Sequence, residues 1–303
     1  YEEIEKFILD GVSIAQFSPF LLTKVIGNIA AGHIAIRYGF SGVNYATTSA
    51  CASSANAIAD AFNYIRLGKA NIIIAGGTEA PINKLSIACF SGMQAISRRN
   101  DDPSTASRPF DKYRDGFVLG EGAGALVLES LDHALARNAP IYAEMVGAGL
   151  SADAFHITSP HPQGKGAELS MKNALEDAGL PIEAIDHINL HGTSTSLGDI
   201  AEIKAIMSLF DRHVYNIKLT AVKSMIGHLL GAAGVVEAIA TVLSIKNDMI
   251  PPIINHFELD EVFDKNINFV FNTTQKHKVN TAISNSFGFG GQNASLVFKK
   301  YED

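Results

Sequence analysis

One cysteine, followed directly by a helical pattern, is the first feature of this sequence that could do chemistry. Cys51 lies among small residues in the stretch TTSACASSANAIADAF, residues 47–62. From Ala55 to Ile65, apolar residues recur at spacings of three and four, which predicts one apolar helix face. Because unpaired N–H groups at a helix N-terminus stabilise negative charge, we expect a lowered pKa for the Cys51 thiol. This stretch alone is equally consistent with a buried structural cysteine.

Two histidines stand in turns that follow predicted strands. His191 lies in NLHGTSTSLGD, and His228 lies in the glycine-flanked turn KSMIGHLLGAAG. Sites in open α/β sheets form outside the carboxyl ends of strands, a position that both histidines and Cys51 share. A single histidine there is more often structural, but two in glycine-rich turns favour a common site. The spacings match no zinc motif, so we predict no metal site.

A phenylalanine between glycines is the third unusual feature. Phe289 lies in ISNSFGFGGQNASLVF, near the end of the chain. Because glycine has no side chain to obstruct an approach, a backbone N–H in such a loop can come close to a ligand. A tight hairpin with no further role is the alternative interpretation.

The elements that must position these residues alternate along the chain. Apolar runs bounded by glycine predict strands at 71–77, 122–130, 141–149, 187–192 and 217–224, with SLVFKK closing the chain and VNYATTSA leading to Cys51. Helical patterns lie between them at 52–67, 166–178, 198–210 and 230–246. This alternation predicts an α/β fold with helices on both faces of a sheet.

Composition excludes several classes of protein. The chain has 303 residues and a net charge of −7, which argues against nucleic acid as a partner. We see no signal peptide, and no apolar run that approaches the ~18 residues needed to span a bilayer, so we predict no membrane association. Two cysteines, Cys51 and Cys89, are too few for a disulfide framework and fit a reducing, cytoplasmic compartment. Cys89 has no helix-start signal, and we interpret it as a buried structural residue.

Taken together, these motifs resemble the β-ketoacyl-[acyl carrier protein] synthases of the thiolase fold, and most closely the elongating synthase II type of bacterial fatty acid synthesis. The resemblance extends from about residue 18 to residue 300. The matching stretches, in chain order, are TTSACASS, SRPFDKYRDGFVLGEGAGALVLE, LSADAFHITSP, HGTSTSLGD, KSMIGHLLGAAG and NSFGFGGQNASLVFKK. No single stretch is specific, but their ordered combination is.

The resemblance implies a role for each of these residues. Cys51 would accept the acyl group, and His191 and His228 would be the two catalytic histidines. Lys223 and Glu237 match the family's supporting ionic residues. Two neutral imidazoles would donate hydrogen bonds to an enolate oxygen, and we expect the like charge of Lys223 to keep them neutral.

Other residues would contact the substrate. The backbone N–H groups of Cys51 and Phe289 would form the oxyanion hole. We also expect Phe289 to gate the acyl pocket, because few local contacts should hold a ring between glycines and its loop could switch arrangement at low cost. The remaining predicted substrate-binding residues are Phe90 in the acyl pocket, Thr193 and Thr195 at the pantetheine arm, and Phe287.

The implied fold is a layered αβαβα arrangement of two similar halves, with the first part of the N-terminal half absent from this chain. We expect the N-terminal half over residues 1–138, carrying Cys51, and the C-terminal half over residues 139–303, carrying both histidines. The family forms homodimers in which the strand before the cysteine, here about NYATTSA, pairs across the two-fold axis.

The implied reaction is a decarboxylative Claisen condensation of an acyl-enzyme with malonyl-[acyl carrier protein], which elongates a fatty acyl chain by two carbons. Acyl carrier protein, loaded with acyl or malonyl groups, would be the partner, and it would bring its own phosphopantetheine, so we expect no separate cofactor. Basic residues often found where Gln94 stands could be replaced here by Arg66, Lys69, Arg98 and Arg99. The alternatives are a ketosynthase of a polyketide or aryl-polyene pathway and a non-catalytic partner subunit resembling a chain-length factor, although such subunits lack the cysteine.

Overall fold

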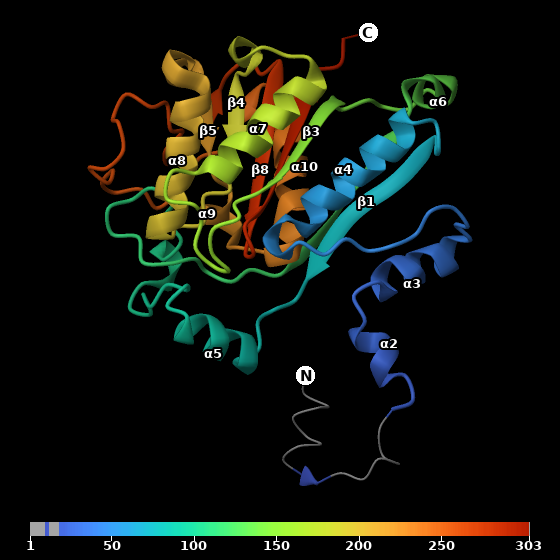
Figure 1. The fold of residues 1–303 in the computed structure, drawn as a ribbon, viewed down its shortest axis with the longest axis horizontal. Coiled ribbons are helices and arrows are strands. Elements are labelled where there is room, and N and C mark those ends of the chain that lie inside the picture. The colour runs from blue at the N-terminus through green and yellow to red at the C-terminus, as the bar shows by residue number, and fades with distance from the viewer. Residues whose placement is uncertain (1–9, 12–17, 303) are drawn as a thin grey trace. The chain divides into compact units, whose positions relative to one another are not determined.

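The computed structural model describes residues 10–11 and 18–302 (Figure 1). The chain divides into two compact units, residues 1–46 and residues 47–303. The first unit contains α2 (Leu21–Val25) and α3 (Ile29–Tyr38). Gly39 ends α3 in the left-handed conformation at φ 70°, where a glycine avoids the steric cost of a Cβ.

A five-stranded sheet is the centre of the second unit. Its strand order is β3 (Glu144–Ala152), β9 (Gln292–Lys299), β8 (Thr281–Gly288), β4 (His187–Asn189) and β5 (Lys218–Thr220). The pairs β3–β9 and β8–β9 are antiparallel, whereas β4 is parallel to both β8 and β5. The carboxyl ends of β8, β4 and β5 therefore meet at one edge of the sheet.

Helices cover both faces of this sheet. On one face, α7 (Lys165–Ala178) and α8 (Ser196–Phe210) enclose a core in which Met171, Ile206 and Ile283 are buried. On the other face, α4 (Ser53–Arg66) and α10 (Ala233–Asn247) enclose a second core. Adjacent residues of β8 contribute to different cores, Ala282 to the second and Ile283 to the first, because successive side chains of a strand point to opposite faces. Figure 1 shows α7 and α10 on opposite sides of the sheet.

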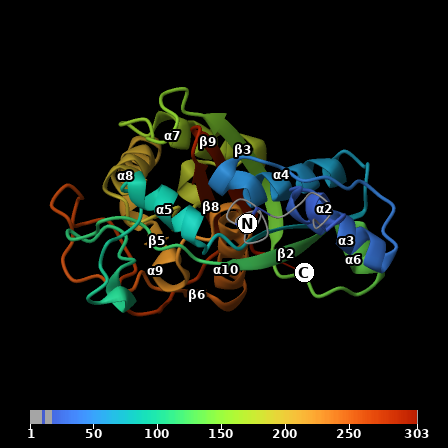
Figure 2. The same cartoon turned by 90° about the horizontal axis from the view of Figure 1, so that it is seen from below.

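A two-stranded antiparallel sheet forms a further layer beyond α4 and α10. It consists of β1 (Ile72–Glu79) and β2 (Gly122–Glu129), and both strands contact both helices (Figure 2). Gly76 and Gly77 let β1 approach its neighbours closely, since a Cβ at Gly77 would lie 2.7 Å from that of Ser54 on α4. The smaller elements are α5 (Lys84–Gly92), α6 (Leu131–Ala136), α9 (Lys223–Ile226), β6 (Met249–Ile250) and β7 (Gln275–Lys276).

The predicted layered α/β architecture is confirmed, with three differences in detail. The strand predicted at 217–224 ends at Thr220, and Lys223 instead begins α9. The long central strand β8 was not predicted, because small polar residues interrupt its apolar pattern although six of its residues are buried. VNYATTSA does not form a strand within the described chain, since residues 43–49 join none of its sheets. The division into halves at residues 138 and 139 stays a prediction.

One helix is long and apolar enough to be a candidate membrane span, although Glu237 and Lys246 interrupt its apolar residues. Leu230–Asn247 has the length and composition for a membrane span, by those two criteria alone. Within this fold 56% of the segment is buried, and α10 packs against β8, β2 and α4. A buried core helix meets the same two criteria, so they are weak evidence for a span.

Candidate active site

Cys51 lies in a strained turn at the start of α4. The turn is a 3₁₀ segment, Ala50–Ala52, and Ala50 adopts φ 49°, a conformation that residues with a Cβ rarely take. Small hydroxyl residues hold it: the Ser49 N–H donates to Ser53 Oγ over 2.9 Å, and Ser53 Oγ donates to the Ala50 carbonyl over 2.7 Å. The small residues of TTSACASS thus build the turn that presents the thiol.

The turn of the β8–β9 hairpin lies against the Cys51 turn. Gly288 permits this approach, because a Cβ there would lie 2.6 Å from the Ser49 carbonyl oxygen. The backbone N–H groups of Phe289 and Cys51 both form hydrogen bonds that favour negative charge on the Cys51 sulfur. These two donors are the pair predicted for an oxyanion hole.

The Phe289 turn is held more firmly than its glycines suggested. Gly290 N–H donates to the Ile157 carbonyl over 2.7 Å, and Asp153 N–H donates to the Gly291 carbonyl over 2.8 Å. Gly290 and Gly291 have φ values of 83° and 72°, a region in which glycine is favoured. The expectation that few local contacts hold Phe289 is therefore wrong for its backbone.

His228 is held by its backbone, its ring nitrogen and its ring edge. Its N–H donates to the Val118 carbonyl over 2.7 Å, and its carbonyl accepts from Gly120 N–H over 3.0 Å. The Phe117 ring meets the His228 ring edge-on, with centroids 5.3 Å apart. Leu230 N–H donates to His228 Nδ1 over 3.3 Å, so the proton of the neutral ring is assigned to Nε2.

His191 follows β4 and is fixed by a buried ion pair. Lys223 Nζ lies 3.3 Å from His191 Nδ1 and forms a salt bridge with Glu237. An ammonium group can only donate, so Nδ1 accepts and the neutral ring carries its proton on Nε2. The rings of His191 and His228 meet edge-on at 5.3 Å between centroids. Neither Lys223 nor Glu237 lines the pocket, and Lys223 reaches it through His191.

Burial keeps both imidazoles neutral. It lowers the pKa of His191 and of His228 well below the usual value for histidine, and the positive charge of Lys223 lowers each pKa further. The sequence argument gave Lys223 as the cause, but removal from water is the larger one. Two neutral rings with protonated Nε2 atoms can donate two hydrogen bonds to one oxygen.

Burial also reverses the expected shift at Cys51. Its thiol pKa is raised to about 11, because loss of solvation outweighs the positive charge of Lys223 and the hydrogen bonds from Phe289 and Cys51 N–H. The prediction of a lowered thiol pKa, made from the helix N-terminus, is therefore wrong. Cys51 does lie at the start of α4, but removing a thiolate from water is costly and raises the pKa.

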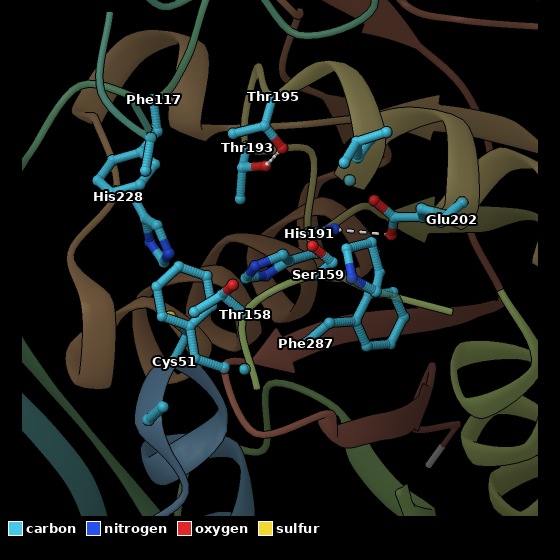
Figure 3. A pocket seen from close by; sticks show the side chains of 18 of the residues that line it. Cys51, Phe117, Thr158, Ser159, His191, Thr193, Thr195, Glu202, His228 and Phe287 are labelled. Carbon is cyan, nitrogen blue, oxygen red and sulfur yellow. Dashed lines mark hydrogen bonds between the residues drawn. The ribbon is translucent and has the colours of Figure 1, made fainter. Parts of the chain in front are cut away.

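Glu202 on α8 was missed by the sequence argument. Its carboxylate accepts from the N–H groups of His191 and Gly192 over 2.8 and 2.9 Å (Figure 3). Burial raises the Glu202 pKa to about 7 despite these hydrogen bonds. Asp199, one turn earlier, accepts from Ser194 and Phe110 N–H in the same way. Two acidic residues spaced by three on an apolar helix are the signal that could have identified them.

One pocket of about 650 Å³ gathers the predicted site residues other than Lys223 and Glu237. The Thr193 and Thr195 hydroxyls lie 2.8 Å apart on its wall (Figure 3). Phe90, on α5, meets Phe117 edge-on at 5.4 Å between centroids. The predicted residues that line the pocket are Cys51, Phe90, His191, Thr193, Thr195, His228, Phe287 and Phe289, and those not predicted include Glu79, Phe117, Thr158, Ser159 and Glu202.

Two other sequence interpretations can be compared with the structure. Cys89 is exposed on α5, so its interpretation as a buried residue is wrong. Within residues 10–11 and 18–302, His, Cys, Asp and Glu side chains form no group of three that could hold a metal ion.

Comparison with known families and proteins gives a consistent picture. Residues 3–134 match the "Beta-ketoacyl synthase, N-terminal domain" and residues 142–257 match the "Beta-ketoacyl synthase, C-terminal domain". The chain is 49% identical to a putative mitochondrial 3-oxoacyl-[acyl-carrier-protein] synthase of Schizosaccharomyces pombe, covering 98% of this chain and 71% of that protein. It is also 49% identical to 3-oxoacyl-[acyl-carrier-protein] synthase 2 of Synechocystis, covering 99% and 72%.

Solved structures agree in fold. A type II polyketide ketosynthase in complex with its acyl-carrier protein superposes with a TM-score of 0.95 at 32% identity, covering 99% of this chain and 74% of that one. A β-ketoacyl synthase from Burkholderia phymatum gives 0.92 at 35% identity, covering 99% and 72%. The layered fold is therefore the thiolase-like fold of ketosynthases, as predicted.

The raised Cys51 pKa predicts how the free thiol reacts. In a Cys89→Ser protein, the rate of Cys51 alkylation by iodoacetamide should rise about tenfold per pH unit from about pH 7 to about pH 9. Only the thiolate reacts, and a thiol with a pKa of about 11 stays mostly protonated over that range. Peptide mass spectrometry would measure the labelling, with Cys51→Ser as the control for site assignment. A rate that levels off below about pH 8 would show a lowered pKa instead.

Proposed function

The chain belongs to the β-ketoacyl synthase family, and on that premise we propose that it is a 3-oxoacyl-[acyl carrier protein] synthase. This acyltransferase elongates a fatty acyl chain by two carbons through decarboxylative condensation with malonyl-[acyl carrier protein]. The observation that carries the proposal is the site itself: a thiol beside two backbone donors, in one pocket with two neutral imidazoles whose Nε2 atoms carry protons.

The first step is acylation of Cys51. Its sulfur attacks the thioester carbonyl of an acyl carrier protein, and the carbonyl oxygen becomes an oxyanion. Donation from the N–H groups of Cys51 and Phe289 to that oxyanion is worth roughly 3–4 kcal/mol per donor in comparable sites. When the intermediate collapses, the carrier leaves as a thiol and takes the proton that Cys51 lost.

The second step makes the carbon nucleophile. Malonyl-[acyl carrier protein] loses carbon dioxide, and the electron pair of the broken C–C bond forms an enolate thioester. The Nε2–H groups of His191 and His228 donate to its oxygen, and their lowered pKa values keep them neutral donors. Because the rings meet at nearly a right angle, 86° between planes, both can approach a single oxygen from different directions.

The third step forms the new carbon–carbon bond. The enolate carbon attacks the acyl carbonyl on Cys51, the same two N–H donors hold the second oxyanion, and the C–S bond breaks. The products are 3-oxoacyl-[acyl carrier protein] and the Cys51 thiolate, which the Lys223 charge helps to stabilise until it takes up a proton from solvent and returns to the thiol. Lys223 and Glu237 therefore support the chemistry through electrostatics rather than through contact with the substrate.

The partner follows from the substrate. We assign acyl carrier protein as the donor of both thioesters, and the Thr193 and Thr195 hydroxyls as hydrogen-bonding groups for its pantetheine arm. A ketosynthase in complex with its carrier is among the structural neighbours. Of the proposed docking cations, Arg66 is paired with Asp177 at the end of α4 remote from Cys51, which favours Arg98 and Arg99. A reducing, cytoplasmic setting would keep the Cys51 thiol available.

A polyketide ketosynthase is the second candidate, because the structural neighbour with a TM-score of 0.95 is one. Sequence identity favours the fatty acid synthase candidate, because the chain is 49% identical to the Synechocystis 3-oxoacyl-[acyl-carrier-protein] synthase 2 and 32% identical to the polyketide ketosynthase. The chemistry would be the same, and only the number of unreduced extensions would differ.

Loss of the Cys51 thiol should abolish the reaction. We expect wild type to convert acyl- and malonyl-[acyl carrier protein] to the 3-oxoacyl product, and Cys51→Ala to form no acyl-enzyme while its melting temperature stays close to that of wild type. Intact-protein mass spectrometry would detect the adduct. Acylation of the Ala variant would refute the assignment, and products of several unreduced extensions by wild type would favour the polyketide alternative.

The gate role of Phe289 predicts a change in specificity. Phe289→Ala should narrow the difference in acylation rate between short and long acyl-[acyl carrier protein], with little loss of melting temperature, because the ring would no longer select at the pocket. Phe155→Ala is the control, since that ring is 54% exposed and does not line the pocket. An unchanged rate ratio together with a much lower melting temperature would identify Phe289 as a core residue.

We further propose a homodimer. The segment NYATTSA that leads to Cys51 has a strand-like sequence, and Val43 just before it is 51% exposed, so a second copy of the chain could pair with this segment. Light scattering at micromolar protein should give twice the chain mass of 32.3 kDa. A stable monomer under those conditions would contradict the proposal.

A further inference from the structure

The turn that follows His228 is strained and must be held from outside. Leu230 begins the 3₁₀ segment Leu230–Ala232 and adopts φ 45°, a left-handed conformation that is costly for a bulky side chain. The same residue donates its N–H to His228 Nδ1, which keeps the ring proton on Nε2. The orientation of that N–H therefore depends on whatever fixes this turn.

A carboxylate from another layer of the fold reaches the turn. Glu79 is the last residue of β1, and its Oε2 accepts from Gly231 N–H over 3.2 Å. The approach is close, since a Cβ at Gly231 would lie 2.9 Å from the same Oε2 atom. Glu79 also lines the pocket, although the reaction steps described above give it no role.

We propose that Glu79 is a positioning residue for His228. Its carboxylate holds Gly231 N–H, and the turn so fixed directs the adjacent Leu230 N–H at His228 Nδ1. The ring then presents Nε2–H to the enolate oxygen. This inference rests on the proposed condensation, because it names the residue that prepares one of its two imidazole donors.

The helix that follows does not need Glu79 for its own anchorage. Near the start of α10, Val235 N–H donates to Ser54 Oγ over 2.9 Å, so α4 already fixes the helix. The backbone of His228 is held separately by Val118 and Gly120. What remains for Glu79 is the peptide segment between His228 and the helix, where the tautomer of the ring is set.

The test compares two variants at Glu79 with a control variant at another carboxylate that accepts a backbone N–H. Glu79→Ala removes the acceptor, and Glu79→Gln keeps an acceptor oxygen without the charge. Glu121→Ala is the control, because Glu121 also accepts a backbone N–H, that of Ile82 over 2.9 Å, from an exposed position outside the pocket. Each protein would be assayed for acylation of Cys51, for decarboxylation of malonyl-[acyl carrier protein], and for the histidine ring ¹⁵N shifts.

We expect Glu79→Ala to acylate Cys51 as wild type does, while kcat for decarboxylation falls on the order of tenfold with KM unchanged, as for a small misplacement of a reacting group. Glu79→Gln should restore most of that rate, and Glu121→Ala should match wild type. The ¹⁵N chemical shift of His228 Nδ1 should change in Glu79→Ala alone, because in that variant Nδ1 loses the hydrogen bond from Leu230 N–H.

Two results would overturn the inference. One is a Glu79→Ala protein whose His228 resonances match those of wild type, a readout that holds even if wild type proves inactive and the proposed function is wrong. The other is an equal loss of acylation and decarboxylation together with a lower melting temperature, which would make Glu79 a merely structural residue.

Discussion

The buried ion pair between Lys223 and Glu237 is the interaction on which the site depends. Each side chain is only 1% exposed, and removing one partner of such a pair typically costs about 3–5 kcal/mol, because the other charge is left buried alone. The pair places an ammonium against His191 Nδ1 and its positive charge near Cys51. One buried cation thus sets the tautomer of one histidine, lowers the pKa of both and favours the thiolate of the nucleophile.

Burial keeps the thiol and the two imidazoles of the pocket neutral. The thiol is protonated and both imidazoles are neutral, because each charged form would lose solvation that nothing in the pocket fully replaces. Negative charge develops on the reacting atoms when a thioester supplies an oxygen for the backbone N–H groups or the imidazole Nε2–H groups to stabilise. The donors are fixed beforehand by the strained turn at Ala50, the hairpin at Gly288 and the turn at Leu230, so little reorganisation is needed during the reaction.

The sequence was most informative where local pattern and chemistry coincide. Helical periodicity predicted α4, and a strand–turn motif placed His191 beyond the end of β4, where the structure has it. His228 was expected after a strand as well, but it follows α9 instead. It was least informative where tertiary context decides. No local signal shows that burial outweighs the helix terminus at Cys51, and the spacing of Asp199 and Glu202 on α8 marks these residues without showing that Glu202 reaches back to the N–H of His191. β8 was missed because its small side chains are buried by two helical layers that lie far away in sequence.

The neutrality of Cys51 also bears on oxidative damage. Peroxides attack thiolates, and at neutral pH a thiol with a pKa of about 11 supplies very few of them. Cys51 is in addition only 8% exposed, whereas Cys89 stands open to solvent on α5. The burial that raises the pKa of Cys51 should therefore also slow the formation of sulfenic acid at its sulfur.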